Sequence, residues 1–222
     1  MLILRGLLGG VFQFLLLGAL LLIPAGTWNW PRAIQFLFAY AILLVCAIVW
    51  LATVAPSSLE ARLEPVINKK QPVADRIATG IIGVAFGAWF MFIPIDVFRL
   101  KLLPPPSLGV SVFGAALFVA GFATVLTALY QNEFATPVVR DQSERGHTLV
   151  DTGLYARVRH PFYTGVLLFL AGLALWLQSY SALIALPVAL GSLFVRIRVE
   201  EKVLCDTLPG YAEYMGRVRY RL

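Results

Sequence analysis

The residues Arg159, His160, Pro161 and Tyr163 stand where a polar segment runs directly into an apolar run, Pro161 to Gln178. Proline suits the first position of a helix, because its missing N–H would be unsatisfied there in any case. The free amides of the residues after it are expected to point back toward the polar segment, and such a helix N-terminus attracts anions. The stretch therefore predicts a binding site for an anionic group at the start of an apolar helix.

A second set of charged residues follows the last apolar run of the chain. If the helix continues there, Arg196 and Glu200 share one face because they are four residues apart, whereas Glu201 is turned well away. That face would present a cation and an anion next to the polar segment.

The polar segment 131–159 is long for a connection between helices, and long loops in compact proteins are often functional. Within it, Gly146 and Gly153 bracket an alternation of polar and apolar residues that ends at Tyr155. We expect an extended, strand-like passage there, whose exposed backbone groups could bind a nucleoside.

The composition is that of an integral membrane protein, because 222 residues that are 59% hydrophobic and 14% charged, with a mean hydropathy of +0.81, are too apolar for a soluble domain. A membrane helix needs about 20 apolar residues, and such runs occur at 6–23, 33–54, 77–98 and 108–130, followed by shorter ones at 161–178 and 181–195. We therefore expect an all-α fold, a polytopic transmembrane helical bundle of about five to six membrane helices in one domain over residues 1–222. The last two are joined at Ser179 and Tyr180, a connection so short that they must form a tight antiparallel hairpin.

Lysine and arginine indicate the orientation of the bundle. With a cytosolic N-terminus, all of the 18 Lys and Arg residues except Arg32, Arg99 and Lys101 fall on the cytosolic side, as do all of the acids except Asp96. We therefore expect both termini and the active site at the cytosolic membrane face.

Several other classes of protein and site are disfavoured. The net charge of +6 is spread over membrane-flanking segments and interleaved with acids, so topology explains it better than nucleic-acid binding. Cys46 lies in an apolar run and Cys205 in a polar tail, so no disulfide is expected between them. No metal site is expected either, because His147 and His160 have no Cys or acid at ligand spacing.

The groups described so far fit S-adenosylmethionine, although residue types alone do not select that ligand. The helix start at Pro161 offers N–H groups for its carboxylate, and Glu200 offers a counter-charge for its ammonium group. Tyr155 and Tyr163 offer aromatic faces for its sulfonium cation or its adenine ring.

The order of these motifs resembles that of the isoprenylcysteine carboxyl methyltransferase family. The similarity rests on the run from Gly146 to Gly165, on Arg-x-x-x-Glu-Glu at 196–201 and on Pro209 to Tyr214, and this multi-part order makes it specific. Residues 57–65 and the pair Asp75-Arg76 are similar to segments of bacterial-type members. Phe162 is bulkier than the residue that eukaryotic members prefer at its position.

The resemblance implies S-adenosylmethionine-dependent methylation of a lipophilic or prenylated acceptor in the lipid bilayer, foremost the carboxylate of an isoprenylcysteine-like molecule. It assigns the cofactor site to residues 131–222. Arg196 would face the acceptor carboxylate, and Arg196 and Glu200 are the residues expected to serve the reaction. The positions that match cofactor ligands are His147, Thr148, Leu149, Val150, Tyr155, His160, Pro161, Phe162, Tyr163 and Glu200, with Glu201 beside them.

Other functions stay open on the sequence alone. The acceptor could be an amine, as in phospholipid N-methylation, which would require a deprotonating group such as Glu201 or Tyr163. A non-enzymatic membrane protein, such as a transporter, is a further alternative, although transporters usually carry ionisable residues at mid-membrane and these runs hold essentially none.

Simpler roles also stay open for individual residues. His160 could cap its helix, and Arg196, Arg198 and Lys202 could be membrane anchors. Glycines in two of the apolar runs are expected to serve close helix packing rather than ligand contact: Gly80, Gly83, Gly87, Gly114 and Gly121.

Overall fold

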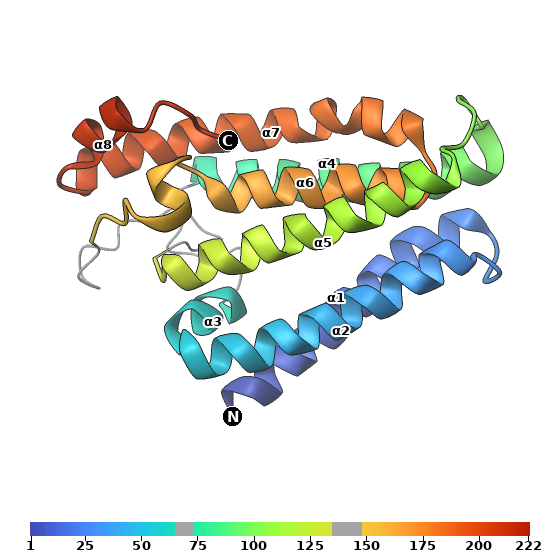
Figure 1. Ribbon diagram of the computed structural model, residues 1–222, viewed down its shortest axis with the longest axis horizontal. Helices are drawn as coiled ribbons and strands as arrows, with labels where there is room; N and C mark the ends of the chain where they lie inside the picture. Colours follow the sequence, from blue (N-terminus) through green and yellow to red (C-terminus); the bar gives the residue numbers. More distant parts are fainter. Residues whose placement is uncertain (65–72, 135–147) are drawn as a thin grey trace.

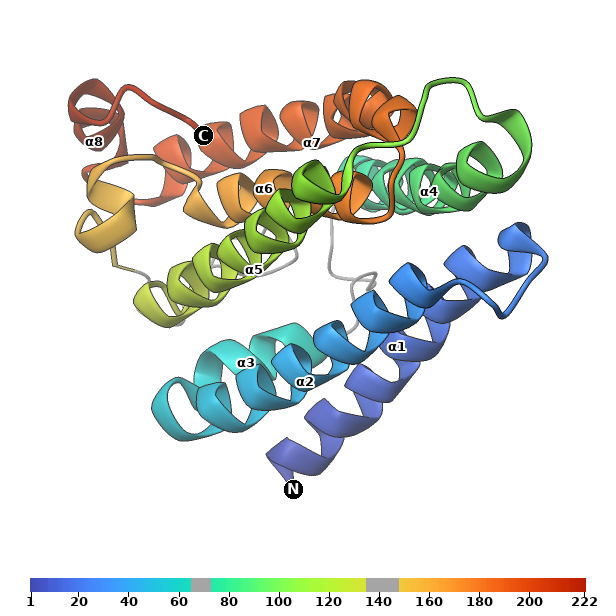
Figure 2. The ribbon, with the colours of Figure 1, turned by 45° about the vertical axis from the view of Figure 1, so that its right-hand side comes forward.

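The computed structural model describes residues 1–64, 73–134 and 148–222, and in these ranges the chain is helical without strands. Figures 1 and 2 show α1 to α3 on one side of a helical bundle and α5 to α7 on the other. The long helices are α1 (Leu2–Ala25), α2 (Pro31–Val54), α4 (Val73–Ile95), α5 (Leu108–Gln131), α6 (Pro161–Trp176) and α7 (Tyr180–Thr207). The expected all-α bundle is thus confirmed.

Short elements lie at the two ends of the bundle. α3 (Pro56–Leu63), the 3₁₀-helix η3 (Gly153–Ala156) and α8 (Tyr211–Arg217) lie at the end drawn on the left of Figure 1. The π-helix η1 (Asp96–Leu100), which continues α4, lies at the opposite end. The left-hand end therefore holds η3 and α8, which belong to the polar parts of the chain for which the sequence predicted chemistry.

Five stretches are long and apolar enough to cross a membrane: α1, α2, α5, α7 and residues Arg76–Leu100. α6, with 16 residues, is shorter. These five helices fit an integral membrane protein and agree with the expected five to six membrane helices.

α7 differs from the short apolar run predicted at 181–195. It continues without interruption through Pro187 to Thr207 and has 28 residues, which corresponds to roughly 42 Å at 1.5 Å per residue. The helix therefore extends from its apolar part into the charged residues Arg196 to Glu201, which the predicted helical register required.

The closest approach in the bundle is between α5 and α6, which are separated in sequence by the long polar segment. A methyl group added at Gly114 would lie 2.6 Å from Leu175 Cβ and 2.7 Å from the Trp176 amide nitrogen, and one at Gly165 would lie 2.7 Å from the Val125 nitrogen. Gly121 and Gly172 are as closely approached by backbone atoms of the other helix. Glycine lets the two backbones touch, as expected for Gly114 and Gly121.

The packing role expected for the glycines of α4 was wrong. Around Gly80, Gly83 and Gly87, nothing in the described part of the chain lies within 4 Å of a built Cβ. A glycine spacing in the sequence does not say which helix face is buried, and here neighbouring helices pack on the other residues of α4, among them Trp89 and Phe90.

Asp96, the one acid expected away from the cytosolic side, is buried in the fold. Its carboxylate accepts hydrogen bonds from the Ser179 hydroxyl at 2.6 Å and the Leu102 amide at 3.1 Å. It therefore ties the end of α4 to the turn between α6 and α7.

Candidate functional site

Two groups of polar side chains lie close together where the C-terminal part of α7 meets the start of α6. We call the first the Tyr163 cluster, which consists of Arg62, Thr79, Tyr163, Arg196 and Glu200. We call the second the Glu201 cluster, which consists of Arg159, His160, Glu201 and Arg221.

The Tyr163 cluster joins four helices, α3, α4, α6 and α7. The Tyr163 hydroxyl on α6 donates to Glu200 Oε2 on α7 at 2.8 Å, and Arg196 is within hydrogen-bonding reach of the same tyrosine. Arg196 is only 7% exposed, and its Nη1 donates to Thr79 Oγ1 on α4 at 3.3 Å. A cation, an anion and a phenol thus face one another at the end of the bundle.

Arg62 brings a second guanidinium to this cluster from α3. Its Cζ lies 4.8 Å from the centre of the Phe162 ring, a cation–π geometry. Burial lowers the pKa of Arg62 to about 10, while the nearby Tyr163, Tyr155 and Glu200 act to raise it. The guanidinium therefore keeps its charge at neutral pH.

The Glu201 cluster fastens the C-terminal tail to the start of α6. Glu201 is 5% exposed and pairs with Arg159 at 3.1 Å, with His160 Nε2 at 3.3 Å and with Arg221 at 2.8 Å. The amides of Arg159 and His160 donate to the carbonyls of Tyr220 and Arg221, both at 2.9 Å. Hydrogen bonds to Glu201 raise the pKa of Arg221. This cluster holds the fold together around the candidate site.

The adjacent acids Glu200 and Glu201 therefore serve different clusters. Glu200 shares the face of Arg196, and Glu201 points to Arg159 and Arg221, which is the register expected for a regular helix. The role of membrane anchor considered for Arg196 does not match the burial of its side chain, since a membrane anchor would be exposed like Arg198.

The start of α6 has the expected form. Pro161 occupies the first turn, and His160 precedes it without making a side-chain cap, because its ring contacts Glu201 instead. The capping role considered for His160 was therefore wrong. Among the described residues, the amides of Phe162 and Tyr163 have no hydrogen-bond acceptor, so the helix retains two donors for an anion.

The segment before α6 was expected to be extended, and this is only partly right. Thr148 to Asp151 has no regular structure, but Gly153–Ala156 forms η3, because the Leu154 amide donates to Gln131 Oε1 at 2.9 Å and pulls the chain against the end of α5. Local alternation could not reveal that tertiary contact.

The cofactor residues expected in this segment have distinct surroundings. Thr148 is exposed and Val150 is half-buried. Leu149 packs on the apolar cluster of Leu208, Tyr211, Tyr214 and Val218, and His147 lies outside the described residues.

Tyr155 is buried beneath α8 and the end of α5. Its carbonyl accepts a hydrogen bond from the Tyr214 hydroxyl at 2.8 Å, and its own hydroxyl lies 3.4 Å from the Ala128 carbonyl. Burial raises the pKa of Tyr155 far above its ordinary value and that of Tyr214 to about 12. Both phenols are therefore neutral hydrogen-bonding groups at physiological pH.

Two members of the Tyr163 cluster were missed from the sequence. Arg62 was attributed to membrane topology, and Thr79 is one hydroxyl in an apolar helix with nothing to distinguish it. In the structure, Arg62 follows the residues of α3 that pack inward, Ser58, Leu59 and Ala61, and this burial could not be read from the sequence. Only the tertiary structure, in which Phe162 packs against the apolar cluster that contains Leu59, shows that Arg62 lies over the Phe162 ring.

Comparison with known proteins gives two matches. The model of the phospholipid methyltransferase family matches residues 110–208. A protein-S-isoprenylcysteine O-methyltransferase of Saccharomyces cerevisiae is 31% identical over 132 residues, which are 58% of this chain and 54% of that protein. The chain thus spans about half the length of this curated relative, and the family-model match includes α6 and α7 but neither α3 nor Thr79.

Proposed function

Because the chain is similar to the isoprenylcysteine carboxyl methyltransferases in its motifs and in its match to a curated member, we propose that it is an S-adenosylmethionine-dependent methyltransferase of a lipophilic carboxylate. The Tyr163 cluster is the proposed active site, with both termini at the cytosolic face. The acceptor would be an isoprenylcysteine-like molecule.

The residues at the start of α6 fit the amino acid head of the cofactor. The amides of Phe162 and Tyr163 are donors for its carboxylate, and Glu200, held by Tyr163 at 2.8 Å, is an acceptor for its ammonium group. S-adenosylmethionine supplies a methyl group on a positively charged sulfur. Besides these, we propose His147, Thr148, Leu149, Val150, Tyr155, His160 and Pro161 as neighbours of the cofactor, from the resemblance.

The contacts of Glu201 favour a different role for that residue. Three basic groups surround it, and its carboxylate links the start of α6, α7 and the C-terminal tail. We propose that Glu201 positions the segment before α6, and that of these two adjacent acids only Glu200 contacts the cofactor.

Two arginines favour a carboxylate as acceptor. Arg196 and Arg62 converge on Tyr163 from α7 and α3, and a guanidinium has five N–H donors in a planar fork that matches a carboxylate. An ammonium acceptor would be repelled by the same two cations. This convergence of two guanidinium groups is the observation that carries the proposal.

The two residues considered as a base for an amine acceptor, Tyr163 and Glu201, are both engaged in other contacts. An amine must lose a proton before or during methyl transfer, whereas a carboxylate is already anionic at neutral pH. The Tyr163 hydroxyl donates a hydrogen bond to Glu200, and Glu201 is engaged by Arg159, His160 and Arg221. For a carboxylate, the chain has only to position the acceptor, compensate its charge and exclude water.

Transfer of a radiolabelled methyl group tests the proposal. The purified chain in lipid would be supplied with labelled S-adenosylmethionine and either a prenylated cysteine carboxylate or phosphatidylethanolamine. We expect the prenylated cysteine carboxylate to become labelled. Mild base should release this label, because methyl esters hydrolyse and N-methyl groups do not. Base-stable label in the phospholipid would instead show that the acceptor is an amine and not a carboxylate. If calorimetry detected no binding of S-adenosylhomocysteine, the proposal that the chain is a methyltransferase would be contradicted.

A further inference from the structure

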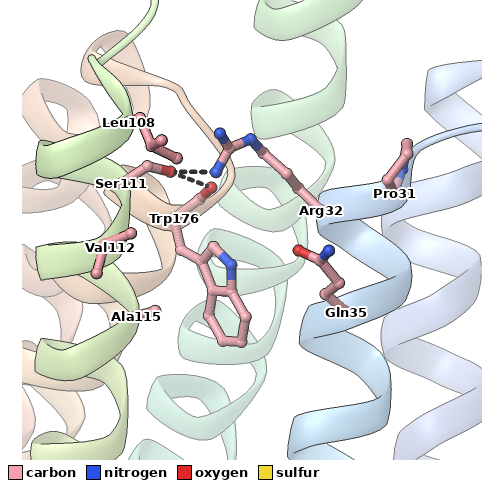
Figure 3. Close-up of a pocket in the computed structure, with 8 residues that line it drawn as sticks. All are labelled: Pro31, Arg32, Gln35, Leu108, Ser111, Val112, Ala115 and Trp176. Atoms are coloured by element: carbon pink, nitrogen blue, oxygen red, sulfur yellow. Dashed lines mark hydrogen bonds between the residues drawn. The ribbon is translucent and has the colours of Figure 1, made fainter.

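A cavity of about 400 Å³ lies at the opposite end of the bundle from the Tyr163 cluster, between the first turns of α2 and α5 and the end of α6. α6 separates the two sites by its 16 residues, roughly 24 Å. Figure 3 shows Arg32 and Gln35 of α2 on one side of the cavity and Ser111 and Trp176 on the other. Nothing in the proposed methyl transfer uses this site.

Arg32 is a cation without a carboxylate partner in the described part of the chain. Its Nη1 donates to the Ser111 hydroxyl at 2.6 Å, and that hydroxyl lies within hydrogen-bonding distance of the Leu175 and Trp176 carbonyls, at 3.1 and 2.9 Å. Ser111 thus fixes the guanidinium at the cavity by one N–H and leaves others for a ligand. Asp96, the acid at this end, is held by Ser179 and Leu102.

Further donors line the same cavity. The Gln35 amide and the Trp176 indole N–H have no hydrogen-bond partner among the described residues. In Figure 3 the Gln35 side chain extends into the space below Arg32, and the Trp176 ring stands across from it with its nitrogen on the side of Arg32. A guanidinium, an amide and an indole N–H are therefore available to one anionic group.

The wall below these donors is apolar and open. Val112 and Ala115 follow Ser111 along α5, toward the middle of the bundle (Figure 3). Val112 is 61% exposed, and Leu108 at the mouth is 69% exposed. A ligand with its charge at the end of the bundle and its hydrocarbon along α5 would match this order, and it could enter sideways from the apolar surroundings.

We propose that this cavity binds the phosphodiester headgroup of a bilayer phospholipid. The negative phosphodiester pairs with Arg32 and accepts hydrogen bonds from Gln35 and Trp176, while an acyl chain lies against Val112 and Ala115. The positive end of α2, whose first turn carries Arg32, adds to the attraction. The bound lipid would fill the gap between α2 and the α5–α6 pair.

Native mass spectrometry of the whole chain in detergent tests this site. We expect saturable binding of phosphatidylglycerol, weaker by about ten-fold or more in Arg32→Gln, because a charge-assisted pair is lost. Arg99→Gln is the matched control, since it removes the same charge from an exposed residue at the same end of the bundle, and should bind like the unaltered chain. Diacylglycerol with the same chains should not bind, and millimolar inorganic phosphate should not displace the phospholipid.

Each other result would overturn the proposal. Equal weakening by Arg32→Gln and Arg99→Gln would indicate general surface electrostatics, and displacement by inorganic phosphate would indicate a site for a free anion. If Arg32→Gln did not fold, Trp176→Phe would replace it, because phenylalanine keeps the ring packing against Phe36 and Phe118 and removes only the N–H. Unchanged phospholipid binding in Trp176→Phe would then contradict the site. S-adenosylhomocysteine affinity should not change in any of these variants, which separates this test from that of the methyltransferase.

Discussion

At the scale of single residues, Glu200 and Glu201 show how much adjacent side chains of one type can differ. Glu200 accepts from Tyr163 beside Arg196, whereas Glu201 is enclosed by Arg159, His160 and Arg221. The first carboxylate is available to a cation that enters the cluster. The second is committed to ion pairs that fasten the chain.

Glutamine substitutions should separate these two roles. Glu200→Gln should weaken S-adenosylhomocysteine binding by roughly 30-fold or more, since losing a desolvated charge partner costs about 2 to 5 kcal/mol. Glu201→Gln should instead lower the free energy of unfolding by about 1 to 3 kcal/mol, less than for a fully buried pair because Arg221 is 33% exposed. Calorimetry and thermal unfolding measure both quantities. The opposite pattern would exchange the two assignments.

A substitution of Arg196 tests whether this residue contacts the acceptor or the cofactor. Because lysine keeps the charge but loses the planar fork, Arg196→Lys should leave S-adenosylhomocysteine affinity within a few-fold and lower turnover of a carboxylate acceptor by about ten-fold or more, at least ~1.4 kcal/mol of transition-state stabilisation. A parallel loss of binding and turnover would place Arg196 in the cofactor site or in the fold.

Arg62 provides an independent test from another helix. Arg62→Gln should raise KM for the carboxylate acceptor or lower kcat/KM by about ten-fold, because a charged donor next to Phe162 is removed. Arg198→Gln, on the exposed face of α7, is the control and should retain activity. If the two variants behaved alike, Arg62 would be only one of several basic residues at this end.

At the scale of helices, the fold depends on the backbone contact of α5 with α6. These helices are joined by the segment that carries several of the proposed cofactor residues, so their close contact fixes the end of α5 against the start of α6. Gln131 then holds η3, and the Glu201 cluster holds the residues before Pro161.

Alanine substitutions of glycine should reveal which helix faces are packed. Gly114→Ala should lower the free energy of unfolding by about 1 to 3 kcal/mol, because the new methyl group would lie 2.6 Å from Leu175 Cβ and 2.7 Å from the Trp176 nitrogen. Gly83→Ala should be neutral or stabilising, since no described atom lies within 4 Å and alanine favours a helix. Thermal unfolding in detergent compares the two. A destabilised Gly83→Ala variant would indicate that this face of α4 is covered.

At the scale of the whole molecule, the two proposed sites lie at opposite ends of the helical bundle. α3, η3 and α8 lie at the end of the Tyr163 cluster, and η1 lies at the other with the Arg32 cavity (Figure 1). The distribution of Lys and Arg predicts that the Tyr163 end faces the cytosol.

Labelling of cysteines checks this orientation. The native Cys205 is exposed near the end of α7, so in a Cys46→Ala background a membrane-impermeant thiol reagent should label it only after the cells are opened. Ser107→Cys in a background without Cys46 and Cys205 should be labelled in intact cells, because Ser107 is exposed at the opposite end. The reverse labelling pattern would invert the bundle.

The sequence by itself determined the elements of this protein. Apolar runs, and Pro161 as a helix start, predict helices whose observed ends lie only a few residues away, except for the C-terminal end of α7, because a membrane helix must satisfy its own backbone hydrogen bonds. The spacing of Arg196, Glu200 and Glu201 likewise predicts their faces, because helical periodicity is local.

Tertiary structure alone decided how these elements meet. Nothing local distinguishes Gly114, which touches α6, from Gly83, which touches nothing described, because both lie in equally apolar helices. Arg62 and Thr79 join the Tyr163 cluster, and Arg32 joins a cavity with Trp176, only because helices distant in sequence pack together. The physical reason is that lipid-facing and bundle-facing surfaces are both apolar here, so hydrophobic patterning predicts the helices but not the faces they bury.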